Sequence, residues 1–227
     1  MNDYEIALKA FLLPMVNEKR MALLENNLKK RTRYITVVLE DIYQPHNASA
    51  VLRTCDGFGI QDVHIIENRN TYEINPEVEL GTAQWLSLYR YNEQENNTEA
   101  AISSLKKKGY RIVATTPHTD EITITDFDIS KSKTAVLFGT EIRGLSDTAL
   151  EMADDYVKIP MVGFAESFNI SVSAAIVLSE FISKFEQSKI PRGLEPAEAE
   201  EIMLQWVRNS INHIRLIESG FKKRFQR

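Results

Sequence analysis

The chain has 227 residues, 43% of them hydrophobic and 26% charged, with a formal net charge of -5 and a single cysteine. This composition is typical of a globular protein with one core domain and extensions, or with two small domains. It excludes an intramolecular disulfide, and no apolar run approaches the length of a membrane span.

The N-terminal segment is acidic before it is apolar, because Asp3 and Glu5 precede the apolar stretch that reaches Pro14. Signal peptides begin with basic residues, so we expect a cytoplasmic protein. Residues 4–30 predict one or two helices interrupted near Pro14, followed by the basic run that ends at residue 33.

Strands and helices alternate from residue 34 onward. β-branched residues indicate the strands, and segments closed by glycine indicate the helices. Asn47 is a candidate N-cap of the first of these helices. In order, we expect a strand at 34–42, a helix at 47–59, strands at 62–67 and 87–91, a helix at 98–108 and a strand at 110–116.

The second half of the chain repeats the alternation. We expect a strand at 134–139, a helix at 146–153 capped by Ser146, and a strand at 155–161. A long amphipathic helix and, after a linker at 188–196, a helix at about 197–218 complete the chain. The apolar face of the long helix comprises Ile170, Ala174, Val177, Leu178, Phe181, Ile182 and Phe185. The pattern predicts an α/β fold with a mostly parallel sheet, helices on both faces and helical extensions at both ends.

The two ends of the chain are basic, although the whole chain is acidic. Residues 1–33 carry a balance of +3 and residues 208–227 a balance of +5, which leaves -13 for the centre. Basic termini predict a polyanionic partner held by the ends of the chain. The alternative is that these runs are solvated helix ends, where cations are favoured.

The stretch VLFGTEIRGLSD, residues 136–147, has the glycine spacing of a phosphate-binding P-loop. The position of the P-loop lysine, however, holds Leu145, and Glu141 lies within the turn. A carboxylate opposes phosphate binding, so the sequence argues against a nucleotide triphosphate as the ligand of this loop.

Three polar loops follow predicted strands, at the edge where open α/β sheets bind ligands. The loops carry Asn47 and Arg53, Glu141, and the pair Ser167 and Asn169. Each residue also has a structural interpretation: helix caps for the two asparagines and Ser167, a turn for Glu141, and a surface pair with Asp56 for Arg53. The residues alone predict a ligand pocket and leave its chemistry open.

Neither metal binding nor cysteine chemistry is indicated. The histidines, His46, His64, His118 and His213, lack metal-ligand spacing, and no CxxC pair exists, so we expect no metal. Cys55 lies in an apolar helix, which favours a buried small residue over a nucleophile.

Across residues 34–185 the three loops resemble the three motifs of the SpoU/TrmH branch of the SPOUT methyltransferases. DIYQPHNASAVLRTCDGFGI is similar to motif 1, LFGTEIRGLSD to motif 2 and IPMVGFAESFNISVSAAIVL to motif 3; Phe168 and Ile170 replace the commoner leucine and valine. The resemblance implies transfer of a methyl group from S-adenosylmethionine to a ribose 2′-hydroxyl of RNA. It also implies a C-terminal trefoil knot and a homodimer with a shared active site.

The resemblance further implies which residues act. Thr115, Gly139, Ile159 and Phe168 match the cofactor-binding positions, and we expect the missing Cβ at Gly139 to let its backbone approach the cofactor. Arg53 is implied as the central catalytic residue. Because a guanidinium hardly releases its proton, we interpret Arg53 as orienting the RNA phosphate and stabilising developing negative charge. Asn47 and Ser167 are implied to hold Arg53 and the ribose, with Glu141 and Asn169 supporting the loops.

Helical extensions at both ends resemble those of family members that methylate guanosine 18 in the D-loop of tRNA. We therefore expect an extension at 1–33, a methyltransferase domain at 34–187 and a basic extension at 188–227. An rRNA nucleotide is the alternative substrate. A catalytically silent RNA-binding member of the fold is disfavoured because Arg53 is present, and a Rossmann enzyme because QPHNAS lacks GxGxxG.

Overall fold

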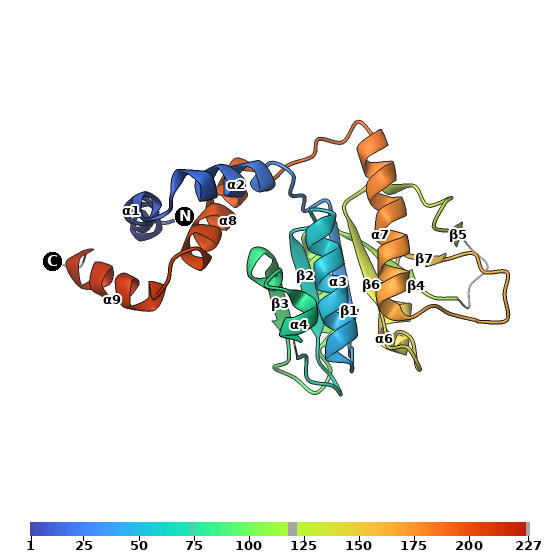
Figure 1. The fold of residues 1–227 in the computed structure, drawn as a ribbon. Helices are drawn as coiled ribbons and strands as arrows, with labels where there is room; N and C mark the ends of the chain where they lie inside the picture. Colours follow the sequence, from blue (N-terminus) through green and yellow to red (C-terminus); the bar gives the residue numbers. More distant parts are fainter. Residues whose placement is uncertain (74, 118–121, 226–227) are drawn as a thin grey trace. The chain divides into compact units, whose positions relative to one another are not determined.

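The computed structural model describes residues 1–73, 75–117 and 122–225, which form two compact units. The larger unit comprises Thr32–Arg192, and the smaller combines Met1–Arg31 with Gly193–Arg227. Figure 1 shows the elements of both units along the chain. None of the helices in the described part of the chain is long and apolar enough to cross a membrane.

The larger unit contains a sheet in which, among the described residues, seven strands pair in parallel in the order β3-β2-β1-β6-β4-β7-β5. This confirms the predicted mostly parallel sheet. The two-residue strand β5 was not predicted, because two residues carry no periodicity. The strands are β1 Ile35–Glu40, β2 Asp62–Ile66, β3 Ser87–Tyr91, β4 Arg111–Thr115, β5 Ile122–Thr123, β6 Thr134–Phe138 and β7 Asp155–Lys158.

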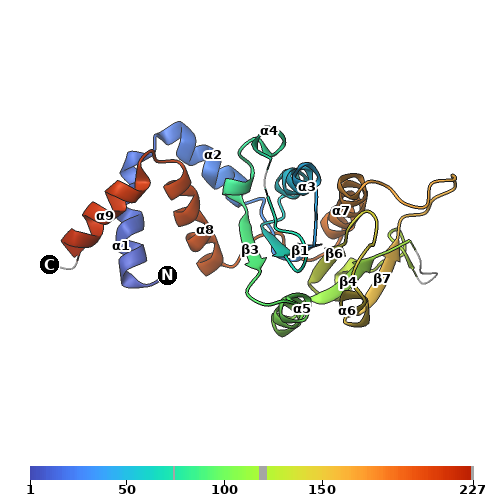
Figure 2. The same ribbon diagram turned by 90° about the horizontal axis from the view of Figure 1, so that it is seen from below.

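Helices cover both faces of the sheet, as Figure 2 shows: α3 and α7 lie on one face, and α5 and α6 on the other. Side chains of β1 alternate between the two layers, with Val37 and Leu39 in one core cluster and Val38 in the other. Burial on both faces explains why the central strands are continuously apolar. The helices are α3 Pro45–Gly57, α4 Pro76–Glu79, α5 Thr98–Lys107, α6 Asp147–Glu151 and α7 Ile170–Gln187, with short 3₁₀ turns at Ala83–Trp85 and Ile129–Lys131.

Two helix features agree with the sequence prediction, and one does not. All seven predicted apolar positions of α7 are buried, and the Ser146 hydroxyl caps α6 by accepting a hydrogen bond from the Ala149 amide. Asn47, however, does not cap α3. The helix begins two residues earlier at Pro45, with Gln44 in the N-cap position, because the ring of a proline presets helical φ in the first turn.

The smaller unit is a helical cluster of α1 Asp3–Leu12, α2 Glu18–Leu28, α8 Pro196–Asn209 and α9 Ile214–Phe225, with a 3₁₀ turn at Leu13–Met15 after α1. The predicted interruption near Pro14 is confirmed. The predicted single C-terminal helix is wrong, because residues 210–213 separate α8 from α9 and His213 has a φ of 56°. A left-handed residue cannot continue an α-helix.

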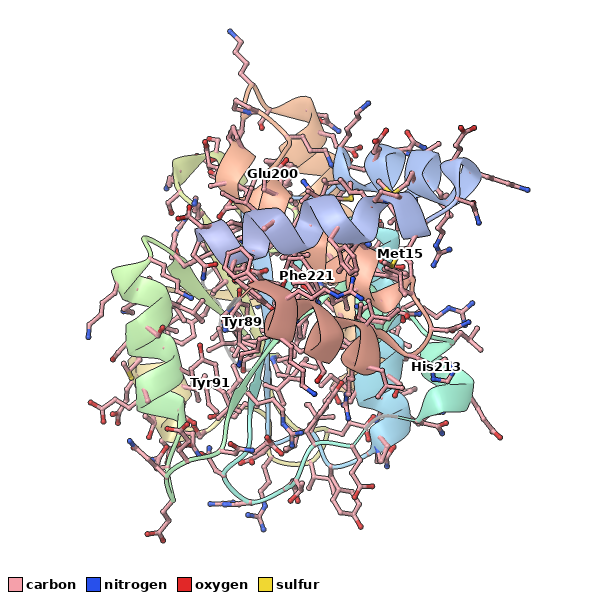
Figure 3. All side chains as sticks on the ribbon, turned by 90° about the vertical axis from the view of Figure 1, so that its left-hand side faces the viewer. Met15, Tyr89, Tyr91, Glu200, His213 and Phe221 are labelled. Atoms are coloured by element: carbon pink, nitrogen blue, oxygen red, sulfur yellow. The ribbon has the colours of Figure 1, made fainter. Side chains whose placement is uncertain are left out.

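Helix α9 packs against α1 through aromatic rings. The ring of Phe221 lies 4.9 Å from that of Phe11 and 5.7 Å from that of Tyr4, and Phe225 lies 5.3 Å from Tyr4. Figure 3 shows Phe221 between the two helices. The basic residues 222–224 of α9 are exposed. The aromatic face thus holds the helix while its cations remain accessible.

His64 on β2 makes folding stability depend on pH. It is 1% exposed, its ring stacks on Tyr89 at 4.7 Å, and burial together with the Lys108 cation lowers its pKa to about 3. In the unfolded chain the pKa is about 6.5. The folded protein therefore holds a neutral imidazole while the unfolded chain takes up a proton, so stability present above pH 6.5 is lost as the pH falls towards 3.

Below pH 6 we expect the free energy of unfolding to fall by an amount that approaches about 1.4 kcal/mol per pH unit. Urea unfolding of the wild type and of His64→Phe between pH 7 and pH 4.5 measures it, and the variant should show the shallower pH dependence. Because His46 is exposed, His46→Phe is the matched control for the replacement of a histidine by phenylalanine. Equal slopes for wild type and His64→Phe would disprove the assignment.

Candidate functional site

The predicted site loops leave the sheet at neighbouring strand ends. β1 and β6 pair side by side, β6 pairs with β4, and β4 with β7. The chain leaves β1 through α3 and returns as β2, which pairs with one side of β1. On the other side of β1 lies β6, which continues the sheet. The carboxyl ends of β1 and β6 therefore form the topological switch point, where open α/β sheets bind their ligands.

Asn47, Glu141 and Asn169, one from each motif loop, form a hydrogen-bonded cluster. The Asn47 amide nitrogen donates to Glu141 Oε1 at 3.0 Å, and the Asn169 amide nitrogen donates to Asn47 Oδ1 at 3.1 Å and also to Glu141 Oε1. Asn169 caps α7 as well, since its Oδ1 accepts from the Ser171 amide at 2.9 Å. One carboxylate, in the loop after β6, thus joins the first turn of α3 to the start of α7.

Arg53 and Ser167 lie outside this cluster. Arg53 is exposed on α3, six residues or about 9 Å of helix beyond Asn47 and on a different face. Within the described part of the chain its guanidinium has no hydrogen bond or ion pair, so the suggested pair with Asp56 is absent there. Ser167 is exposed in the loop before α7. One copy of the chain therefore does not bring all five predicted residues together.

The four residues at the predicted cofactor positions come from three adjacent strand ends. The Thr115 hydroxyl, at the end of β4, donates to the Leu137 carbonyl at 2.7 Å. Ile159, after β7, packs against the larger core cluster, and Phe168, in the loop before α7, is 39% exposed. Gly139 follows β6 directly. The set offers apolar side chains and backbone groups, without a cationic side chain.

The structure gives a reason for glycine at position 139 that the sequence did not indicate. A Cβ at this position would lie 2.2 Å from both the carbonyl carbon and the oxygen of Gly144. The loop closes on itself here, with Thr140 and Gly144 exchanging two backbone hydrogen bonds of 2.9 Å. Glycine is required because the loop's own backbone fills the space that a Cβ would take.

A cleft of about 1030 Å³ opens at the switch point, and we call it the switch-point cleft. Asn47 and Glu141 line it, whereas none of the four predicted cofactor residues does. The remaining walls come from residues 40–44, 68–70, 95–96, 140 and 142–148, together with Ile170. Much of this lining lies in the motif segments, whereas residues 68–70 and 95–96 belong to two further loops that the sequence pattern did not indicate.

Two carboxylates at the end of β1 hold the walls of the switch-point cleft. Glu40, 3% exposed, accepts hydrogen bonds from the Ser146 amide and hydroxyl and from the Thr98 hydroxyl. Asp41, at a φ of 53°, accepts from the backbone amides of Asn68 at 2.7 Å and Arg69 at 2.8 Å. A carboxylate that accepts several hydrogen bonds is rigidly placed. The loops after β1, β2 and β6 are therefore held in fixed positions relative to one another.

Metal ligation was not expected from the sequence, and the described residues contain no group of three histidine, cysteine or acidic side chains that could hold a metal ion. His118 lies outside the described residues. Cys55 is buried in the core cluster on α3, as predicted.

Known proteins match the chain over most of its length. Residues 34–179 match the profile of the SpoU rRNA Methylase family. The tRNA (guanosine(18)-2'-O)-methyltransferase of Borreliella burgdorferi is 40% identical over 96% of this chain and 98% of its own length. The enzyme of the same description from Thermus thermophilus is 33% identical over 84% and 97%. The crystal structure of the A. aeolicus TrmH/SpoU tRNA modifying enzyme aligns with a TM-score of 0.77 at 27% identity, covering 86% of this chain and 98% of that one.

Proposed function

The chain belongs to the SpoU rRNA Methylase family, and on this basis we propose that it transfers a methyl group from S-adenosylmethionine to a ribose 2′-hydroxyl of RNA. The observation that carries the proposal is the Asn47–Glu141–Asn169 cluster, in which one carboxylate joins the three family motifs. A side chain shared by three loops can fix the positions of two substrates that must meet. Such alignment supplies much of the acceleration when the transferred group is already activated.

We propose guanosine 18 in the D-loop of tRNA as the target. Relatives that match 96% and 84% of the chain carry that activity in their names, and the similarity to the Borreliella burgdorferi enzyme extends into both terminal segments. The exposed basic residues 222–224 of α9 suit a phosphate backbone. An rRNA nucleotide is the second candidate, favoured only by the description of the family.

The proposed cofactor residues are Thr115, Gly139, Ile159 and Phe168. Their chemistry fits S-adenosylmethionine, because the partly exposed Phe168 and the apolar Ile159 suit an adenine ring, and the set has no cation for a phosphate. When bound, the cofactor supplies an activated methyl group. The chain's own contribution is to hold its loops in place: Glu141 anchors the loop after β6, and Asn169 anchors the one before α7.

We propose that Arg53 acts in the active site of a second copy of the chain. Its exposed position on α3, outside the cluster, supports a homodimer with shared sites. Exposed apolar side chains in the loops after β6 and β7 support an interface: Ile142, Val162 and Phe164. In this arrangement Arg53 orients the RNA phosphate next to the target ribose and stabilises negative charge on the attacking oxygen, with Ser167 and Asn47 positioning both.

We make three further proposals, on the trefoil knot, the location of the protein in the cell and the terminal segments. We propose that the loops around β7 and α7 form the family's trefoil knot, and that the protein acts in the cytoplasm, where tRNA is modified. We also propose that residues 1–33 and 188–227 are RNA-binding extensions of the methyltransferase domain at 34–187. The packing of α8 and α9 with α1 and α2 in one compact unit supports joint action of the two ends.

Purified protein incubated with unmodified tRNA transcript and S-adenosylmethionine labelled on the methyl group tests the function. We expect label in the tRNA that survives digestion of the protein and is lost when the cofactor is omitted. Transcripts of rRNA form the comparison. If neither RNA becomes labelled under conditions in which a relative from this family is active, the proposed activity is wrong.

A further inference from the structure

Most polar groups in the wall of the switch-point cleft are already engaged. Asn68 donates to the Thr98 hydroxyl and accepts from the Asn97 amide, and Asn70 donates to the Asp41 carbonyl. The Glu40 and Asp41 carboxylates are likewise occupied, by hydroxyl and amide donors. These side chains build the cleft and are not its recognition groups.

A second set of side chains lines the cleft without holding its walls in place. The guanidinium groups of Arg69 and Arg143 have no hydrogen bond or ion pair among the described residues, and neither do the carboxylates of Glu95 and Asp147. Tyr43, which follows β1 by three residues, is 75% exposed and lines the cleft. Two free cations, two free carboxylates and an exposed aromatic ring therefore meet in one cavity that is large enough for a nucleotide.

This combination selects one class of ligand. The exposed ring of Tyr43 suits the face of a nucleobase, since aromatic side chains bind unpaired bases by stacking. Arg69 and Arg143 suit the flanking phosphates. A free polyphosphate fits poorly because Glu95 and Asp147 would repel it, whereas a base with N–H donors can bind a carboxylate. Guanine presents such donors on its Watson–Crick edge.

We propose that the switch-point cleft holds the target nucleotide of the RNA, with its base unstacked from its neighbours and placed against Tyr43 and its flanking phosphates near Arg69 and Arg143. The site lies next to Asn47 and Glu141, which face the same cleft, so the ribose of a bound nucleotide reaches the cluster that joins the motif loops. This inference deepens the proposed function and rests on it. It assigns to Tyr43, Arg69 and Arg143 a substrate-binding role that lies outside the resemblance.

The test compares variants of the full-length protein in two assays. Binding of unmodified tRNA transcript is measured by filter retention at several salt concentrations, and methyl transfer gives KM for tRNA and for S-adenosylmethionine separately. We expect Tyr43→Ala to raise the Kd and KM for tRNA about tenfold, the scale of one base stacked on an aromatic side chain. Tyr43→Phe keeps the ring and should stay within about twofold of wild type. Neither variant should change the KM for the cofactor.

Arginine variants test the phosphate contacts. Arg69→Gln and Arg143→Gln should each weaken tRNA binding and lower the salt dependence of log Kd by about one unit of slope. Lys107→Gln is the matched control, because Lys107 is an exposed cation at the far end of α5, away from the cleft. Thermal unfolding of every variant separates a binding defect from a folding defect.

The outcomes separate this inference from the proposed function. If the wild type methylates tRNA while Tyr43→Ala, Arg69→Gln and Arg143→Gln bind and react like wild type, the cleft is not the nucleotide site and only this inference fails. If the wild type methylates no RNA, the proposed function fails. A selective rise in the KM for tRNA, absent in Tyr43→Phe and Lys107→Gln, establishes the site.

Discussion

An Arg53→Ala variant is expected to transfer methyl groups about 100- to 1,000-fold more slowly than wild type, the usual effect of removing one donor that stabilises charge in the transition state. The fold should be intact, because Arg53 is exposed and the described structure contains no hydrogen bond or ion pair that depends on it. The KM for S-adenosylmethionine should be unchanged, since Arg53 is separate from the cofactor positions. Arg53→Lys should recover only part of the rate, because an ammonium lacks the planar fork of a guanidinium.

Mixing experiments show on which copy Arg53 acts. If Arg53 completes the site of a partner chain, equal amounts of Arg53→Ala and Glu141→Ala protein, unfolded and refolded together, should regain about a quarter of wild-type activity, since half of the dimers are mixed and each has one intact site. If Arg53 acts on its own chain, both sites of a mixed dimer are damaged and no activity returns. Turnover by Arg53→Ala close to wild type would remove Arg53 from the mechanism.

Glu141 is expected to have the second large effect. Its Oε1 accepts hydrogen bonds from both Asn47 and Asn169, so Glu141→Ala separates the loops after β1 and β6 from the start of α7. Asn47, which is 3% exposed, would also lose one of the two acceptors of its amide nitrogen and keep only Gln44 Oε1. We expect kcat to fall about 100-fold or more, because small misplacements of reacting groups cost that much.

Two further variants make the Glu141 test specific. Glu141→Gln keeps one acceptor oxygen and should retain more activity than Glu141→Ala. Glu151→Ala removes an exposed glutamate at the end of α6 and should behave like wild type. The measurement is kcat and KM for both substrates, with thermal unfolding as the folding control. Activity of Glu141→Ala within twofold of wild type would show that the cluster does not position the reacting groups.

Patterns of apolar residues predicted the sheet and its principal helices. The apolar face of α7 was predicted residue by residue, because one helix buried along one face leaves a clear 3.6-residue period. Features set by single residues were harder to predict. Helix α3 begins at Pro45, before Asn47, and the left-handed backbone of His213 interrupts the C-terminal helix. Neither feature changes the spacing of the apolar residues, so the apolar pattern could not predict it.

The site residues that belong to sequence motifs could be predicted from the sequence. Asn47, Glu141 and Asn169 were named from the sequence, and the structure brings them together. The helical period of α3 already places Arg53 on another face from Asn47, which is why one chain does not gather all the predicted residues. Tyr43, Arg69 and Arg143 meet only because loops after different strands share one edge of the sheet. Sequence spacing cannot show such an arrangement.

Mapping of the modified nucleotide shows whether the protein methylates a ribose in tRNA. Unmodified tRNA and rRNA transcripts are treated side by side with the protein and S-adenosylmethionine and digested with a base-specific ribonuclease, and the oligonucleotide fragments are sequenced by mass spectrometry. We expect one 2′-O-methylguanosine, at position 18 of the tRNA D-loop, and none in rRNA. A methyl group on a base, or no methylated ribose in either RNA, would contradict it.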